Sequence, residues 1–221
     1  MTKKIFFSDK YGLTDAVLQG RKTMTRGLVG KSMTEDDIRA YLKGYTELAN
    51  KCANYKIGEV VAVAQRGISI YHALQERYGE TSDAALGFKE MYEGMPMWRN
   101  KLFVPADLCP NQIRITDIKV ERLQDISDED CFKEGIIPIT WRQHLRQDFD
   151  DLTPQKYIDH NVYTLEKFRE GIEDCWAESD PNEYMAEEAK VAFAVLIFKT
   201  LGRKVWDANP WVFAYGFELV K

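Results

Sequence analysis

The sequence predicts an α+β domain built around a small mixed or barrel-like sheet. Strand-like and helix-like segments do not alternate regularly along the chain, which argues against a doubly wound sheet. The strand-like segments carry glycine and bulge signals, which are typical of small barrels. Residues 211–220 are apolar on both faces of a strand, so we expect this segment to be buried in the centre of the sheet.

The first quarter of the chain is predicted to hold two strands and two helices. Residues 11–19 read as a helix that stops at Gly20, because glycine readily takes the left-handed conformation that ends a helix. Thr34 precedes "EDD" and offers a capping oxygen before an acidic first turn, so a second helix should run from there to about Asn50. The two strands are predicted at residues 4–8 and 57–65.

The middle of the chain combines an irregular strand with a short helix. In residues 112–123 the apolar positions alternate up to Ile115 and then shift parity at Ile118. A one-residue shift of this kind predicts a β-bulge or a tight bend. The short helix follows, with Ser127 as its cap, acidic residues in its first turn and Gly135 as its stop.

Three further segments complete the expected elements. Residues 68–92 are predicted to be helical or irregular. Residues 140–182 are polar and lack a clear period, and a helix is expected within them at 165–177. Residues 183–201 form a strong helical pattern that Gly202 closes.

Composition and cysteine usage are those of an ordinary globular protein. The 221 residues are 45% hydrophobic and 29% charged, and no apolar run approaches the roughly 20 residues of a membrane span. No secretory signal is visible, so we expect a cytoplasmic protein without membrane contacts. The cysteines are scattered and the histidines lack metal-ligand spacing, so no metal or cofactor is expected. These residues are Cys52, Cys109, Cys131, Cys175, His72, His144 and His160.

Positive charge is concentrated near the start of a chain whose net charge is −5. Residues 1–31 hold seven Lys or Arg and two Asp, a net charge of +5. An acidic protein with one basic segment is poorly suited to grip a long nucleic acid through many phosphates. A pocket for one anionic or nucleotide-like group fits better, and the alternative is a solvated basic loop.

The densest part of this segment is "GRKTMTR", residues 20–26. Repulsion from Arg21 and Arg26 disfavours the ammonium form of Lys22, and burial would act in the same direction, so Lys22 could serve as a base. Thr25 could offer its hydroxyl as a nucleophile or a donor. The alternative is that Thr23 and Thr25 are there for strand propensity and that the basic residues are solvated.

Two residues outside the segment are candidates for the same site. Glu134 is expected at the C-terminal end of its helix, an unfavourable place for a carboxylate unless a cation such as Lys22 compensates it. Trp98 lies in the loop-like "GMPMWRNKLFV" and is the best tryptophan for a ligand wall. The alternative for Glu134 is a solvated carboxylate, as at most helix ends.

Taken together, several blocks resemble the ASCH (activating signal cointegrator homology) domain family, in its bacterial and phage-associated branch. The blocks cover about half of the chain in the family's order: "VLQGRKTMTRGLV", "IGEVVAVAQ", "WRNKLFV", "RITDIKVERLQDISDEDCFKEGI" and "AFAVLIF…G…W…NPWVFAYGFELV". The resemblance implies one domain over residues 1–221 with a PUA-like fold, a small partly open β-barrel with peripheral helices and a cleft for RNA or a nucleoside. Residues 34–55, 68–95 and 140–182 would be helical insertions in that core.

The resemblance also implies a catalytic site. Some small bacterial ASCH proteins are amidohydrolases that deacetylate N4-acetylcytidine with a lysine, a threonine and a glutamate. The motif places these three on Lys22, Thr25 and Glu134, and Arg26 matches a basic residue that would position a phosphate or a carbonyl oxygen. The residues expected to bind substrate are Arg21, Thr23, Arg26 and Trp98.

Three functions therefore stay open at this point. The first is amide hydrolysis on a modified cytidine, with Thr25 as nucleophile, Lys22 as base and Glu134 orienting Lys22. The second is a non-catalytic module that binds RNA or a nucleotide, and the third is an accessory protein whose added segments bind a protein partner. The similar hydrolases are much smaller than this chain, so the insertions could reshape the cleft.

Overall fold

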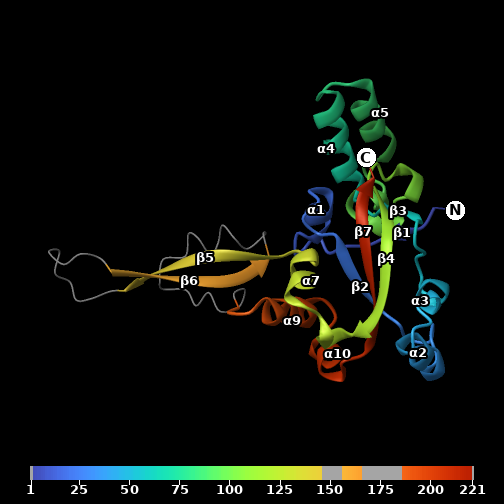
Figure 1. Ribbon diagram of the computed structural model, residues 1–221. Coiled ribbons are helices and arrows are strands. Elements are labelled where there is room, and N and C mark those ends of the chain that lie inside the picture. Colours follow the sequence, from blue (N-terminus) through green and yellow to red (C-terminus); the bar gives the residue numbers. More distant parts are fainter. Residues whose placement is uncertain (1, 146–155, 166–185, 221) are drawn as a thin grey trace.

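The computed structural model describes residues 2–145, 156–165 and 186–220. It is an α+β protein, as predicted, with a five-stranded mixed sheet, a separate two-stranded ribbon and helices on both faces of the sheet (Figure 1). The order of the main sheet is β1 (Lys4–Ile5), β3 (Val60–Val63), β4 (Gln112–Arg122), β7 (Trp211–Val220) and β2 (Met24–Leu28). Only β1 and β3 are parallel. Among the described residues no pairing joins the edge strands β1 and β2, so the sheet is open rather than a closed barrel.

The described helices are of two kinds, α-helices and short 3₁₀ turns. The α-helices are α1 (Leu13–Leu18), α2 (Glu35–Leu42), α3 (Glu47–Cys52), α4 (Gly67–Tyr78), α5 (Asp83–Tyr92), α6 (Pro96–Arg99), α7 (Asp128–Lys133), α9 (Ala189–Thr200) and α10 (Arg203–Ala208). Short 3₁₀ turns are η1 (Lys101–Phe103), η2 (Ala106–Leu108) and η3 (Leu123–Asp125). No helix in the described part of the chain is long and apolar enough to cross a membrane.

Strand β7 is an interior strand of the sheet with both faces buried, as its apolar residues predicted, although the strand at the centre is β4. It pairs with β2 on one side and with β4 on the other. Phe213 and Ala214, which project to opposite faces, are both fully buried. Helices α2 and α3 lie on one side of the sheet and α7 and α9 on the other (Figure 1).

The irregularity predicted in β4 is confirmed. Its register against β7 shifts between Ile115 and Asp117, which leaves Thr116 as an extra residue. The shift turns Ile118 to the buried side again, so both halves of the strand contribute apolar side chains to the core.

Sequence signals at helix ends were also correct. The side chain of Thr34 caps α2 in a capping box with Asp37, and the Ser127 hydroxyl accepts a hydrogen bond from Asp130 N–H at the start of α7. Gly20 and Gly135 take positive φ values after α1 and α7. Gly202 does the same after α9.

Two helix predictions need correction. The expected helix from Thr34 to about Asn50 is two helices, because Gly44 (φ +108°) breaks it between α2 and α3. The helix expected at 183–201 begins at Ala189, and residues 183–185 lie outside the described residues.

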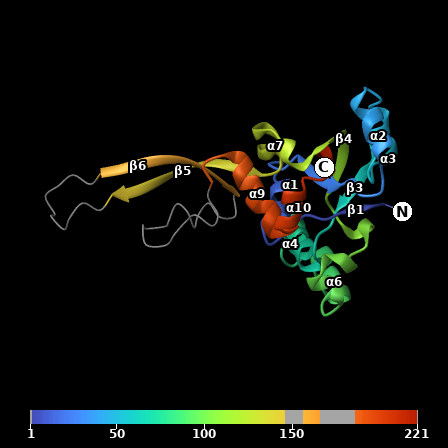
Figure 2. The same ribbon diagram turned by 90° about the horizontal axis from the view of Figure 1, so that it is seen from below.

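The largest miss is the ribbon of β5 (Ile136–Leu145) and β6 (Lys156–Leu165). Its strands pair antiparallel over ten positions without a register shift, and Figures 1 and 2 show it extending away from the sheet. Leu165 ends a strand here instead of starting a helix, and residues 166–177 lie outside the described residues. The segment is polar, so it lacks the apolar alternation by which a half-buried strand is recognised.

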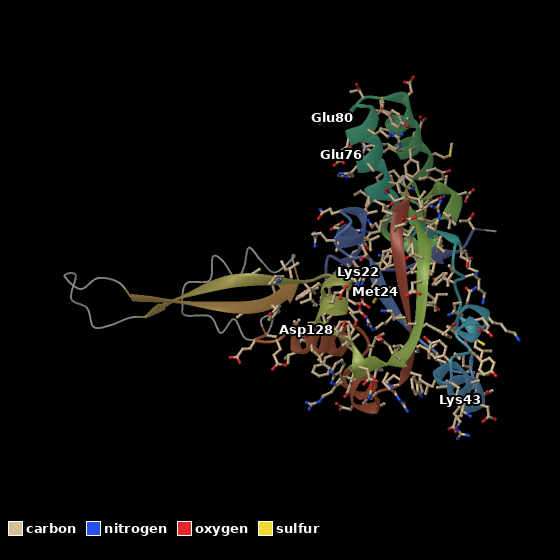
Figure 3. All side chains as sticks on the ribbon, in the orientation of Figure 1. Lys22, Met24, Lys43, Glu76, Glu80 and Asp128 are labelled. Carbon is tan, nitrogen blue, oxygen red and sulfur yellow. The ribbon has the colours of Figure 1, made fainter. Side chains whose placement is uncertain are left out.

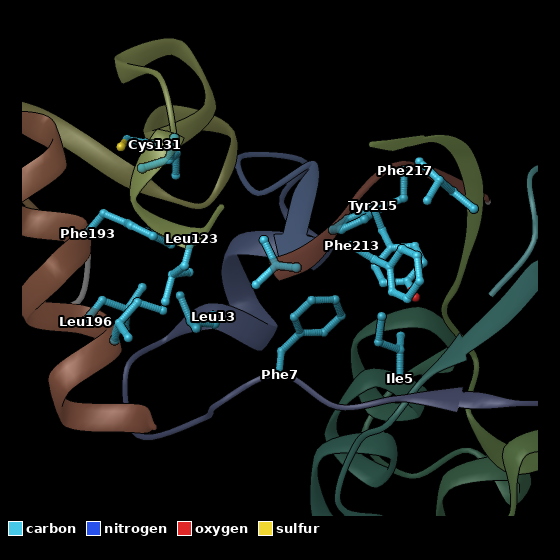
Figure 4. Packing of buried hydrophobic residues seen from close by; sticks show 14 of the residues in the cluster. Ile5, Phe7, Leu13, Leu123, Cys131, Phe193, Leu196, Phe213, Tyr215 and Phe217 are labelled. Carbon is cyan, nitrogen blue, oxygen red and sulfur yellow. The ribbon is translucent and has the colours of Figure 1, made fainter. Parts of the chain in front are cut away.

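The main hydrophobic core packs around the sheet and takes in side chains of α1, α2, α3, α7 and α9, and Figure 4 shows part of it. Phe7 packs against Phe217 with ring centroids 5.7 Å apart. A smaller cluster that includes Ile70 and Met97 lies under α4 and α6. The first cluster borders the segment 20–26, so the basic motif meets the edge of the main core.

Candidate functional site

The backbone around Lys22 is fixed by three elements. The N–H groups of Arg21 and Lys22 both donate to the carbonyl of Ala16 in α1, at 2.8 and 2.9 Å. The N–H of Thr23 donates to the Lys133 carbonyl at 2.8 Å, and its carbonyl accepts from Phe217 N–H at 2.9 Å. The segment is thus held between α1, the end of α7 and β7.

The C-terminal end of α7 brings Glu134 to this segment. Gly135 (φ +100°) ends the helix, and a Cβ on this glycine would lie 3.7 Å from Lys22 Cβ. Because the chain turns there, Glu134 faces back toward Lys22, and Figure 3 shows Lys22 and Met24 beside α7.

Lys22 and Glu134 form a buried ion pair. The Lys22 amine donates to Glu134 Oε2 and, at 2.9 Å, to the Glu134 backbone carbonyl. The side chains are 1% and 5% exposed. A cation at a helix C-terminus also interacts favourably with the helix dipole, so one lysine satisfies both the carboxylate and the last turn of α7.

The environment lowers the pKa of Lys22. Burial is the main cause, because it penalises the ammonium form, and the positive charge of Arg26 adds to the effect. The Glu134 carboxylate opposes both. The sequence predicted the direction from neighbouring positive charge, whereas burial is the larger cause.

Arg26 joins the same cluster through Glu134. Its Nη1 donates to Glu134 Oε1 at 2.8 Å, and its Nη2 donates to Glu121 Oε1 at 2.6 Å and lies 3.5 Å from Asp130 Oδ2. Burial would lower the pKa of Arg26, but Glu134 and Glu121 outweigh it and raise the pKa. The role expected for Arg26 was to line a basic pocket for substrate, and here its guanidinium is 3% exposed and paired within the protein.

Thr25 lies on the other side of β2. It is directly opposite Tyr215 on β7, whereas Arg26 is opposite Ala214. Opposed residues of an antiparallel pair project to the same face and neighbours along a strand to opposite faces. The half-buried Thr25 side chain therefore shares the face of Tyr215, and within the described residues its hydroxyl has no hydrogen bond to Lys22 or Glu134.

The remaining substrate-binding candidates are dispersed. Arg21 donates twice to Gln19 Oε1, at 3.0 and 2.7 Å. Thr23 contributes backbone hydrogen bonds, from its N–H to Lys133 and to its carbonyl from Phe217. Trp98 is buried in α6, with its ring 5.6 Å from that of Tyr71, and none of its described contacts reaches Lys22.

Much of the positive charge of residues 1–31 is compensated inside the molecule. Lys3 pairs with Glu59 at 2.9 Å, and the Lys4 amine donates to the carbonyls of Leu102 and Val104 at 3.0 and 2.6 Å. Lys22 and Arg26 are the two cations of the segment that lie in buried ion pairs with described residues.

Sequence reasoning missed two carboxylates, Glu121 and Asp130. Glu121 occupies an outward position of β4, and Asp130 was read only as part of the acidic first turn of α7. Their common partner, Arg26, is 95 and 104 residues away in sequence, so only the fold identifies them. In the described ranges no three His, Cys, Asp or Glu residues are placed to hold a metal ion.

Comparison with known proteins finds no family model, no curated protein and no solved structure that matches this chain. The site is therefore defined by its own geometry: a buried amine and a carboxylate that it shares with an arginine. Thr25, next to Arg26 in sequence, projects to the opposite face of β2 from Arg26.

Proposed function

We propose that this chain is an ASCH-like protein with a PUA-like core that binds a modified nucleoside, free or within RNA, and hydrolyses an amide on it. N4-acetylcytidine is the proposed model substrate. The observation that carries the proposal is the buried Lys22–Glu134 pair: burial lowers the pKa of an amine that a carboxylate holds in place. Such a lysine is suited to general-base chemistry.

In the proposed reaction the Thr25 hydroxyl attacks the acetyl carbon while the neutral Lys22 amine takes its proton. The bond from the acetyl carbon to the exocyclic nitrogen breaks, and the proton passes to that nitrogen with the help of Glu134. Cytidine leaves and acetyl-Thr25 remains. Water then attacks the ester, giving acetate and restoring the hydroxyl, so every proton is accounted for.

The attack by Thr25 is the step to test first, because its side chain projects to the other face of β2 from Arg26. The hydroxyl can be removed with little effect on the fold. Its hydroxyl has no hydrogen bond within the described residues, so Thr25→Val should change the free energy of unfolding by no more than about 0.5 kcal/mol.

The test compares Thr25→Val with Thr25→Ser on N4-acetylcytidine. Valine keeps the shape of the side chain and removes the hydroxyl, and serine keeps the hydroxyl. We expect turnover to fall by at least about 100-fold in the valine variant and to persist in the serine variant. Acetyl-Thr25 should be detectable by mass spectrometry of the wild type during turnover.

Equal activity of Thr25→Val and the wild type would remove Thr25 from the reaction. Loss of turnover in both variants together with loss of folding, seen by circular dichroism, would assign Thr25 a structural role instead.

A further inference from the structure

All five N–H groups of the Arg26 guanidinium have a partner inside the protein. Nε and one N–H of Nη2 face Glu121 Oε1, at 3.2 and 2.6 Å, and the other N–H of Nη2 faces Asp130 Oδ2 at 3.5 Å. Nη1 faces Glu134 Oε1 at 2.8 Å and Met24 Sδ at 3.6 Å. Arginine has five donors and no acceptor, so none is left for a ligand.

These partners come from separate parts of the fold. Glu121 lies on β4, and Asp130 and Glu134 belong to α7 and its C-terminus. Ala214, opposite Arg26 on β7, is small enough for the arginine to cross that strand and reach β4. The ring of Phe193 in α9 covers the guanidinium at 5.6 Å.

Glu134 divides its two oxygens between two cations. Oε1 accepts from Arg26 and Oε2 from Lys22. The guanidinium that binds Oε1 is itself fixed by its two bonds to Glu121 Oε1, from Nε and Nη2. A carboxylate held by one partner can rotate, whereas one held at both oxygens by fixed partners cannot rotate freely. The orientation of the Lys22 amine therefore depends on a residue that does not touch it.

We propose that Arg26 is a positioning residue: it locks the Glu134 carboxylate so that its second oxygen holds the Lys22 amine in one orientation, and it contacts no substrate. The proposal rests on the proposed function for the role of Lys22. It also predicts a property of the free protein, so it can fail or succeed whether or not N4-acetylcytidine is the substrate.

The charged groups around the pair come from two elements besides β2. Glu134, Asp130 and Lys133 belong to α7 and its end, and Lys133 lies 3.5 Å from Asp130. Glu121 and Lys119 lie on β4, and Lys119 is 3.8 Å from Asp130. In the described part of the chain Glu134 is hydrogen-bonded to both Lys22 and Arg26, so a change at position 26 acts on Lys22 through Glu134 and through the loss or displacement of the Arg26 charge.

The test variant is Arg26→Lys, which keeps the positive charge and loses the planar fork. A single ammonium on a shorter side chain cannot hold Glu121 and Glu134 together, and its charge lies farther from Lys22. We therefore expect the pKa of Lys22 in the free protein to rise, measured by NMR titration of ¹³C-labelled lysine with Lys22→Met as the assignment control. Arg114→Lys, at an exposed ion pair on β4, should leave that titration unchanged.

The kinetic readout separates positioning from substrate contact. The acidic limb of the pH profile should move to higher pH in Arg26→Lys, because a higher pKa leaves less neutral amine at a given pH. The fall in kcat is about tenfold at pH 7 for each unit of that rise, with KM nearly unchanged. A rise in KM with an unshifted Lys22 titration would overturn the proposal and make Arg26 a substrate ligand.

Glu121→Gln is the second variant, in case Arg26→Lys does not fold. It leaves Glu134 intact and removes one negative charge from the partners of Arg26, so the pKa of Lys22 should fall. If neither variant moves the Lys22 titration, Arg26 does not position Glu134 and the proposal is wrong. A moved titration in a protein that does not hydrolyse N4-acetylcytidine would uphold the positioning role and reject the proposed substrate.

Discussion

At the scale of single residues, the site is a chain of charges that crosses the protein interior. Lys22 contacts Glu134, Glu134 contacts Arg26, and Arg26 contacts Glu121 and Asp130. Buried charges persist only when they are paired, because the cost of removing each from water is large. The cluster should therefore respond as a unit to the loss of one member.

Replacing Lys22 tests this at the most buried position. Lys22→Met keeps an unbranched side chain and leaves Glu134 with Arg26 alone, so we expect the free energy of unfolding to fall by about 3 kcal/mol, measured by urea denaturation. Lys89→Met is the matched control, since Lys89 pairs with Glu93 at an exposed (i, i+4) position away from the cluster and should cost less than about 1 kcal/mol. Equal losses in the two variants would contradict the account of the cluster.

The Lys22–Glu134 pair could be predicted from the sequence, whereas the partners of Arg26 could not. A carboxylate at the C-terminal end of a helix is unfavourable unless a cation compensates it, and Lys22 was the candidate cation. Local electrostatics was therefore sufficient to predict the Lys22–Glu134 pair. Glu121 resembles any outward residue of a strand until β2, β7 and β4 are known to be neighbours. The position of Thr25 follows from strand alternation once residues 24–28 are known to form β2 and to pair with β7.

At the scale of elements, α7 is the part that assembles the site. A capped six-residue helix with a glycine stop delivers Asp130 and Glu134 to β2. Its caps and stop were predictable because they depend on neighbouring residues alone. The break at Gly44 between α2 and α3 was harder to predict, since a glycine in a helical pattern is often tolerated.

Gly135 should be needed for both stability and activity. At φ +100° an alanine is strained, which should cost roughly 1–3 kcal/mol. Gly202→Ala is the matched control, with φ +91° after α9 and open space around its Cβ. We expect thermal melting to show similar losses, whereas turnover should fall by up to about 100-fold only in Gly135→Ala, because Glu134 would be displaced.

Turnover that survives in Gly135→Ala to the same extent as in Gly202→Ala would show that the end of α7 does not control the reaction. Measuring both variants at a temperature where each is folded keeps the comparison fair.

At the scale of the whole molecule, the sheet separates two environments. Arg26 and its carboxylates lie on the side of α7 and α9, and the Thr25 face lies on the side of α2 and α3, where Tyr215 accepts a hydrogen bond from Asn54 N–H at 3.2 Å. Lys22 precedes β2, and its amine lies 5.9 Å from the ring of Phe7, which packs against Phe217 on the Tyr215 face. The two cations nearest Thr25 in sequence, Lys22 and Arg26, are held in buried ion pairs inside the protein. A ligand at this site would thus be recognised by its nucleoside more than by its phosphates, which agrees with a chain of net charge −5.

The central claim is that the Lys22–Glu134 pair supports amide hydrolysis on a modified cytidine. The most direct test is the release of cytidine from N4-acetylcytidine by the purified wild-type protein, followed by chromatography over a range of protein concentrations. The account predicts release above the spontaneous rate and in proportion to the protein. Release no faster than the spontaneous rate, at high concentrations of folded protein, would contradict it.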